Sequence, residues 1–385
     1  MSKNSESVPL LNGLRGIAVL GVVWQHLFWV FNIPGQHPIA MGPLLLAGNP
    51  FASNGWMGVN LFFFCSGFVL FLPYCNGRRS FSSHADTVWF WKHRAARLWP
   101  LFYLSLFLGI GVSVTAEELT HPSVIASVFM AMTGLFVLLP YTFMPIGNGV
   151  LWSLGVEALF SAIFPLLERG IRRYGMAHIL VAAIVLGLAC RTLGYYWFRE
   201  PGLYLNFLSD GVLGRMDDFV WGMACARLFA DGRLPRNPAI VWLGCAMLLS
   251  SAVISDMWFA LWTPSWVQAA NFTLFNSGTF LLVSGLLTGG GWLRRIIEFR
   301  LLQVIGMMCF SIYVWHSILY IEMFTRPERF SIADMRHGLP GYLLVLVAVS
   351  CLSYRFIEFP GKSFRELFLL EGSGKELIGG PKSPS

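Results

Sequence analysis

Charged side chains are scarce in this chain. Only 12% of its 385 residues are Asp, Glu, Lys or Arg, whereas an ordinary soluble domain contains about 25%. Hydrophobic residues make up 56% of the sequence. Although the net charge is +7, the basic residues form short clusters between apolar segments, as orientation signals do in membrane proteins. The composition therefore predicts an all-α, polytopic membrane helical bundle, and we expect no nucleic acid as a partner.

Several other signals are missing. The seven cysteines lie in or beside apolar segments, without a C-x-x-C pair or the His/Cys spacing of a zinc site. We expect them to be free packing residues, and we expect no metal. The first apolar segment lacks the short core and small-residue cleavage site of a signal peptide, so we expect it to stay in the mature protein. No internal repeat is visible, and we expect no appended soluble domain.

Eleven apolar segments follow one another along the chain. They cover residues 10–31, 55–74, 98–114, 124–141, 151–167, 176–198, 212–230, 239–262, 271–288, 301–325 and 340–359. If 124–141 crossed the membrane, every later basic cluster would lie outside. The sequence therefore predicts about ten transmembrane helices plus one re-entrant or interfacial segment, with both termini cytoplasmic. Residues 1–368 are expected to form a single domain, and 369–385 a flexible cytoplasmic tail.

The first segment carries two polar side chains at a helical spacing. Arg15 and His26 are eleven residues apart, so both project from one helix face, about 16 Å from each other. Such groups inside a membrane helix are costly, and by default they indicate a functional site. The alternative is an interfacial arginine whose head reaches water, together with a histidine satisfied by a neighbouring helix.

The predicted topology places five titratable residues in the outer half of the membrane: His26, Glu157, Asp217, Asp218 and His316. For Glu157 and Asp217, the alternative to a catalytic role is a buried ion pair with an arginine such as Arg191 or Arg215. For His316 alone, the alternative is a hydrogen-bonded core histidine.

The inner half is predicted to hold arginines. Arg94 and Arg97 lie at i and i+3 of an expected interfacial helix, where two guanidinium groups can bind phosphate oxygens. Such a cluster also serves simply to set orientation or to contact anionic lipid. At the end of the last segment, Arg355 and Glu358 are spaced for a local ion pair. This division suits a reaction with an anionic donor on the cytoplasmic side.

The segments that carry these residues resemble, in order, the signatures of membrane acyltransferase family three. LNGLRGIAVLGVVWQH is similar to the family's "LDGLRGIAxLxVxxxH", and the resemblance continues through FFFCSGFVL, FWKHRAARLWPLFY, WSLGVEALFSAIFP, GRMDDFVWGMACA, SIYVWHSIL and SYRFIEFPGK. Three motifs transfer residue by residue: Arg-x10-His to Arg15 and His26, Arg-x-x-Arg to Arg94 and Arg97, and Trp-Ser-Leu-x-x-Glu to Trp152, Ser153 and Glu157. Asn12 stands where the family usually has Asp.

The resemblance implies an inner-membrane O-acyltransferase that moves an acyl group, often acetyl, from cytoplasmic acyl-CoA to a hydroxyl of an envelope saccharide. The expected partners are acetyl-CoA or another acyl-CoA, a saccharide or lipid-linked saccharide acceptor, and membrane lipid. Arg94, Arg97 and Arg15 are expected to bind the donor's phosphates. His26 is expected to act as general base or to carry the acyl group itself, with Glu157 orienting or stabilising the imidazole. Longer members carry an extra span and a hydrolase-like domain.

Two other classes of protein also use intramembrane polar residues. A secondary transporter or lipid flippase needs midplane carboxylates, histidines and broken helices, but often shows repeated halves. A sensor or scaffold subunit needs no catalytic histidine. Neither consumes an acyl donor, so turnover distinguishes the enzyme from both.

Overall fold

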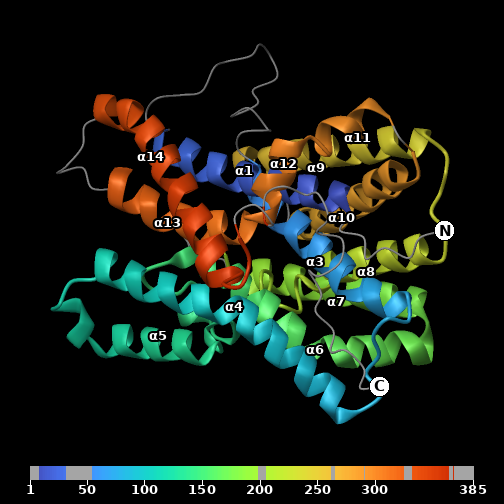
Figure 1. Ribbon diagram of the computed structural model, residues 1–385, viewed down its shortest axis with the longest axis horizontal. Helices are drawn as coiled ribbons and strands as arrows, with labels where there is room; N and C mark the ends of the chain where they lie inside the picture. The colour runs from blue at the N-terminus through green and yellow to red at the C-terminus, as the bar shows by residue number, and fades with distance from the viewer. Residues whose placement is uncertain are drawn as a thin grey trace.

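The computed structural model describes residues 8–31, 54–197, 205–261, 265–289, 291–324, 332–363 and Leu367. All regular structure in these residues is helical, and the helices pack as one bundle (Figure 1). The first helices are α1 (Pro9–Phe31), α3 (Gly58–Cys75), α4 (His84–Ser113), α5 (Pro122–Thr133), α6 (Trp152–Tyr174) and α7 (Met176–Trp197). They are followed by α8 (Met216–Ala230), α9 (Ala239–Leu261), α10 (Ser265–Thr288), α11 (Trp292–Ile297), α12 (Arg300–Met307), α13 (Cys309–Phe324) and α14 (Ile332–Ser353).

Six helices among the described residues are long and apolar enough to cross a membrane. They span Gly55–Cys75, His84–Ser113, Gly149–Tyr174, Met176–Trp197, Trp266–Thr288 and Gly338–Glu358. Helices α12 and α13 meet at a 72° bend and make a seventh span if they are counted as one. The predicted fold class, an all-α polytopic bundle, is confirmed. The count of ten crossings stays a prediction, and the predicted tail 369–385 lies outside the described residues.

The segment 124–141 forms no long helix. Helix α5 has 12 residues and ends at Gly134, whose φ of 74° breaks the helix; short 3-10 turns follow at Phe136–Leu138 and Pro140–Thr142. A helix of this length covers about 18 Å, which is less than the apolar thickness of a bilayer. Helix α5 lies beside α4 (Figure 1), where the Tyr103 hydroxyl donates to the carbonyl of Met132 at 2.8 Å.

Helix α4 differs from the prediction. An interfacial helix ending at Arg97 and a separate span at 98–114 were expected, but the chain continues through both as one helix of 30 residues. Ser83 and Asp86 form a capping box at its start, which satisfies free backbone N–H groups of the first turn. Pro100 lies inside the helix without ending it. As a result, Arg94 and Arg97 lie on the same rigid element as the apolar span.

Helices α3 and α8 approach each other closely because glycines face the contact. A Cβ atom added at Gly222 would collide with the carbonyl oxygen of Phe64, and one added at Gly67 would collide with that of Phe219. Small residues let membrane helices pack backbone to backbone in this way. Beside the contact, the ring of Phe219 stacks on Phe160, with centroids 3.8 Å apart. This packing forms one wall of the interior on which the candidate site lies.

A buried network of five charged residues connects α7, α8 and the loop before α8: Arg191, Asp210, Arg215, Asp217 and Asp218. Arg191 Nη2 donates to Asp217 Oδ2 at 2.9 Å, and Arg215 Nη2 donates to Asp210 Oδ1 at 2.5 Å. Both pairs are almost completely buried. Helix α10 contributes Asn276, whose amide donates to Asp218. The alternative considered for Asp217, an ion pair with a buried arginine, is therefore confirmed.

The α3–α8 contact yields a packing prediction. Replacing Gly222 by alanine forces a methyl group against the backbone of α3, so we expect destabilisation of about 1–3 kcal/mol and a lower melting temperature in detergent. Gly111 is the matched control, because it is also helical but has no neighbouring atom within 4 Å of an added Cβ. Gly111→Ala is expected to leave the melting temperature unchanged or raise it. Equal melting temperatures for the two variants would contradict the close approach of α3 and α8.

The buried network yields a second prediction. Asp217→Ala leaves Arg191 charged and unpaired in the interior, which costs about 3–5 kcal/mol. The matched control is Asp231→Ala, which removes a partially exposed i, i+4 pair with Arg227 and is expected to cost less than about 1 kcal/mol. Thermal unfolding of both purified variants measures the difference. A small loss in Asp217→Ala would show that the buried pair does not hold α7 and α8 together.

Candidate active site

A cavity of about 450 Å³ lies among α1, α3, α4, α6 and the α12–α13 bend. Its polar lining includes five guanidinium groups: Arg15, Arg78, Arg79, Arg94 and Arg97. Glu157 is the one carboxylate among the lining residues. Five cations against one anion leave a surplus of four positive charges, so the cavity strongly favours an anionic ligand.

The lining changes character along α3. Near the start of this helix it consists of Val59, Phe62 and Phe63, whereas Arg78 and Arg79 follow the helix end. Because a helix rises 1.5 Å per residue, these two groups lie at opposite ends of an elongated space. The cavity is therefore cationic at the end of Arg78 and Arg79 and mainly apolar at the other end, although Arg15 comes from the part of α1 that packs against the first half of α3.

Glu157 pairs with Arg94. The Nη2 of Arg94 donates to Glu157 Oε1 at 2.5 Å, its Nε donates to Ser161 Oγ at 3.1 Å, and Ser66 Oγ donates to the same Glu157 oxygen at 2.8 Å. The sequence-based hypothesis placed Glu157 beside His26, but neither a hydrogen bond nor an ion pair connects these two residues in the described structure. The physical reason is the packing of α4 against α6, which brings the Arg94 guanidinium to the carboxylate.

The other cavity arginines are differently placed. Arg15 and Arg97 form no ion pair within the part of the chain that the structure describes, although the carboxylates of Glu157 and Glu358 interact electrostatically with Arg97. Arg79 lies over the ring of Trp89, 4.4 Å from its centroid. Partial burial lowers the pKa of Arg79, yet a guanidinium stays protonated at neutral pH. Two of the three arginines predicted to bind the donor, Arg15 and Arg97, thus stay outside the ion pair that engages Arg94.

The apolar end of the cavity is bounded by Ser153 and Tyr313. Ser153 Oγ donates to the Tyr313 hydroxyl at 2.8 Å, and this hydroxyl donates to the carbonyl of Val150 at 3.0 Å. Trp152, the neighbour of Ser153, does not line the cavity; its ring packs beside Phe63, Phe143 and Arg215. Of the two motif residues, Ser153 therefore lines the cavity, whereas Trp152 belongs to the packing around it.

The two predicted histidines lie together beyond Tyr313. The rings of His26 and His316 are in edge contact, with centroids 4.9 Å apart, and the His316 ring is 5.5 Å from that of Tyr313. Neither histidine lines the cavity. His26 Nδ1 donates to the carbonyl of Val22 at 2.9 Å, so the neutral ring has its lone pair at Nε2. This nitrogen is available to accept a proton.

The remaining predicted positions lie elsewhere. Asp217 belongs to the buried network and does not line the cavity. The predicted pair of Arg355 and Glu358 does not form: Arg355 donates to the carbonyls of Phe359 and Pro360, whereas Glu358 accepts from Ser311. The chain turns through a π-helix at Tyr354–Glu358, which changes the i, i+3 spacing on which the prediction relied.

Sequence reasoning missed Ser66, Tyr313 and the two arginines that follow α3. Tyr313 was detectable, because it lies three residues before His316 and therefore on the same helix face. Arg78 and Arg79 were visible as a basic cluster but were interpreted only as an orientation signal. For Ser66, a small polar residue within an apolar run, no sequence signal pointed to Glu157.

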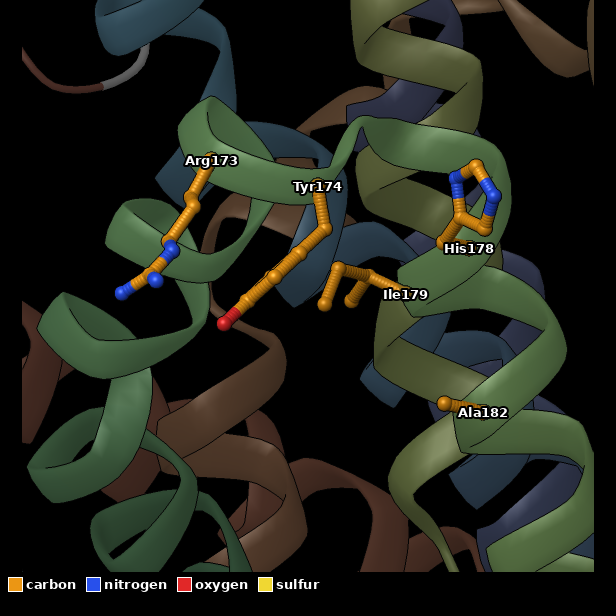
Figure 2. A pocket seen from close by; sticks show the side chains of 5 residues that line it. All are labelled: Arg173, Tyr174, His178, Ile179 and Ala182. Carbon is orange, nitrogen blue, oxygen red and sulfur yellow. The ribbon is translucent and has the colours of Figure 1, made fainter.

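A second, shallow pocket lies at the turn between α6 and α7 (Figure 2). It is lined by Arg173, Tyr174, His178, Ile179 and Ala182. Figure 2 shows the polar ends of Arg173 and His178 pointing apart rather than toward a common point. This pocket lacks converging groups and is not the candidate site.

Comparison with known proteins agrees with the features of the site. Residues 8–355 match the model of a family described as an acyltransferase domain. The chain is 25% identical over 380 residues to the peptidoglycan O-acetyltransferase OatA of Listeria monocytogenes, an alignment that covers 92% of this chain and 55% of that protein. It is also 25% identical over 378 residues to YrhL of Bacillus subtilis, provisionally named a peptidoglycan O-acetyltransferase, with 92% and 54% covered.

The chain thus spans about half the length of the curated relatives that it matches. No solved structure matches it. The family model covers nearly the whole of the described bundle, including both histidines and every arginine of the cavity. This integral membrane protein therefore belongs to the acyltransferase domain family.

Proposed function

We propose that this protein transfers an acyl group, acetyl in the first instance, from cytoplasmic acyl-CoA to a hydroxyl of an envelope or exported saccharide. The observation that carries the proposal is the cavity with its surplus of four positive charges and its apolar far end. Coenzyme A carries a diphosphate and a phosphate monoester, about −4 in total at neutral pH, and an uncharged arm that ends in the thioester. The ligand and the cavity therefore each have a charged part and an uncharged part.

Arg15 and Arg97 bind the phosphates in this proposal, with Arg78 and Arg79 completing the cationic end. Guanidinium groups bind phosphate oxygens through paired hydrogen bonds. Arg94 has a different role from the one its motif suggests. Its charge is balanced by Glu157, so it shapes the wall between α4 and α6 and contributes less to the attraction of the ligand.

The acyl end of the donor would lie next to Tyr313, one side chain away from the histidines. His26 Nε2 takes the proton of the acceptor hydroxyl, whose oxygen attacks the thioester carbonyl. A C–O bond forms, the C–S bond breaks, and the coenzyme A thiolate receives the proton. The same nitrogen is the nucleophile if His26 carries the acyl group first.

The proposal also covers the acceptor and the orientation of the protein in the membrane. Two of the relatives are named for O-acetylation of peptidoglycan, which supports a cell-wall or other exported polysaccharide as acceptor. Acyl-CoA is a cytoplasmic metabolite, so the arginine end of the cavity faces the cytoplasm in the inner membrane. Excess positive charge on that side agrees with the usual orientation rule, and both termini are then cytoplasmic.

Donor binding tests the role of the cavity charge. Removing one arginine outside the ion pair, in Arg97→Leu, is expected to weaken acetyl-CoA binding by about 10- to 100-fold, since a hydrogen bond to a charged group contributes about 1.5–3 kcal/mol. The double variant Arg94→Leu/Glu157→Leu keeps the surplus of four charges and is expected to bind within a few-fold of the parent. Isothermal titration calorimetry of the protein in detergent measures both.

Arg173→Leu is the control for overall charge, because Arg173 is exposed and lies outside the cavity. It should leave the affinity unchanged. Loss of affinity in all three variants alike would mean that binding is non-specific. An unchanged affinity in Arg97→Leu would refute the cavity as the donor site, and no binding by the folded parent would favour a transporter.

Transfer itself tests His26. His26→Ala is expected to lower the transfer rate by at least about 10²-fold, the usual contribution of a general base, while acetyl-CoA still binds because His26 does not line the cavity. The measurement is base-labile radioactivity moved from [14C]acetyl-CoA to isolated cell-wall saccharide. His178→Ala, at the exposed turn after α6, is the control. Full transfer by His26→Ala would exclude both the general-base and the acyl-carrier route.

A further inference from the structure

His316 shows a combination of burial and hydrogen bonding that packing alone does not explain. Its side chain is fully buried, and its Nδ1 donates to the carbonyl of Tyr313 at 2.5 Å. The Nε2 therefore carries the lone pair, yet this buried nitrogen has no hydrogen-bond partner among the described residues. Leaving such an atom without a partner costs about 1–3 kcal/mol. An apolar side chain at this position would avoid that cost.

The neighbour of this imidazole is the proposed base. His26 and His316 come from α1 and α13, and their rings touch edge to face. Each ring is fixed by donation from Nδ1 to a backbone carbonyl on its own helix, so both rings present Nε2 as an acceptor. The pair thus has two proton-accepting nitrogens with both rings held in place.

No carboxylate contacts either ring within the described parts of the chain. The other groups around the pair are Tyr320, whose ring centroid is 5.6 Å from that of His26, and the Tyr342 hydroxyl, which donates to the backbone carbonyl of His316 at 3.2 Å. Glu157, the carboxylate expected to support His26, is engaged by Arg94. Among the described residues, the second imidazole is therefore the basic group in contact with His26 that can share the charge of an accepted proton.

We propose that His316 is a positioning residue that acts through His26, and that the two imidazoles together hold the single proton removed from the acceptor hydroxyl. This rests on the proposed acyltransferase function. The hydroxyl proton moves to His26 as the C–O bond forms and the C–S bond breaks, and it leaves for the coenzyme A thiolate. Between these events the neutral His316 stabilises the imidazolium. Two touching imidazoles cannot both be charged, so the pair accepts one proton at a time.

Two substitutions at His316 separate this role from packing. His316→Asn keeps an N–H donor near the Nδ1 position, so it can still bind the Tyr313 carbonyl, but it has no group at Nε2. His316→Gln places an amide near the Nε2 position, but this amide cannot take a proton. His178→Asn at the exposed α6–α7 turn is the matched control for loss of an imidazole. Each variant is purified in detergent and tested for melting temperature, acetyl-CoA affinity and steady-state transfer.

The transfer assay uses [14C]acetyl-CoA and isolated cell-wall saccharide. We expect both His316 variants to keep the parent's melting temperature and acetyl-CoA affinity while kcat falls at least 10-fold and KM for acetyl-CoA stays constant. His178→Asn should match the parent in every measurement. Parent-like kcat in either His316 variant would overturn the proposal. A fall in acetyl-CoA affinity or melting temperature that parallels the loss of kcat would assign His316 to packing.

If the protein is not an acyltransferase, the same measurements give a different result. In that case the unmodified protein, folded by its melting temperature, neither binds acetyl-CoA nor labels the saccharide, and the role of His316 falls together with the acyltransfer itself. If the unmodified protein transfers acetyl groups and the His316 variants are equally active, only the proposal that His26 and His316 share a proton is refuted.

Discussion

Charge inside a membrane bundle has to be compensated, and in this protein the compensation is uneven. The interior holds two groups of arginines. Around Arg191 and Arg215, three aspartates surround two guanidinium groups. Around the cavity, five guanidinium groups face a single carboxylate. The first group has the counter-charge that a structural network needs, whereas the lining of the cavity carries more positive than negative charge and therefore favours an anionic ligand.

The Arg94–Glu157 pair decides how that surplus is arranged. It fixes α4 to α6 with the help of Ser66 and Ser161, and it uses the one acidic group of the cavity. Arg15 and Arg97, on two different helices, take no part in this ion pair. The same pair also engages Glu157 away from His26, so among the described residues no carboxylate supports this imidazole in the way that Asp does in a Ser-His-Asp triad.

One face of α1 carries both Arg15, which is proposed to bind the donor, and His26, which is proposed to accept the proton. Arg15 lines the cavity, and His26 lies further along the same helix, against His316. Tyr313 lies between the two regions, since it both lines the cavity and touches His316. A thioester bound with its phosphates near Arg15 therefore points toward the imidazoles, and the distance between them is set by the length of one helix rather than by a flexible loop.

Sequence alone determined much of this arrangement. Helix positions and the shared face of Arg15 and His26 follow from local periodicity and composition, which act within a few turns of the chain. The prediction that 124–141 does not cross the membrane came from the distribution of basic clusters along the chain. Several candidate residues were found in the same way. The continuous α4 was not, because the segment that carries Arg94 and Arg97 was interpreted as an interfacial helix separate from the apolar span at 98–114.

The tertiary structure decided which of these side chains contact one another. Glu157 and Arg94, His26 and His316, and the arginines of the cavity are far apart in sequence, and they meet only because of the way the helices pack. Helix contacts depend on the shape of whole faces, including close approaches such as that at Gly222, and a single sequence does not specify which faces meet. The residue types of the site were therefore readable from the chain, but their pairing, which determines their chemistry, depended on the fold.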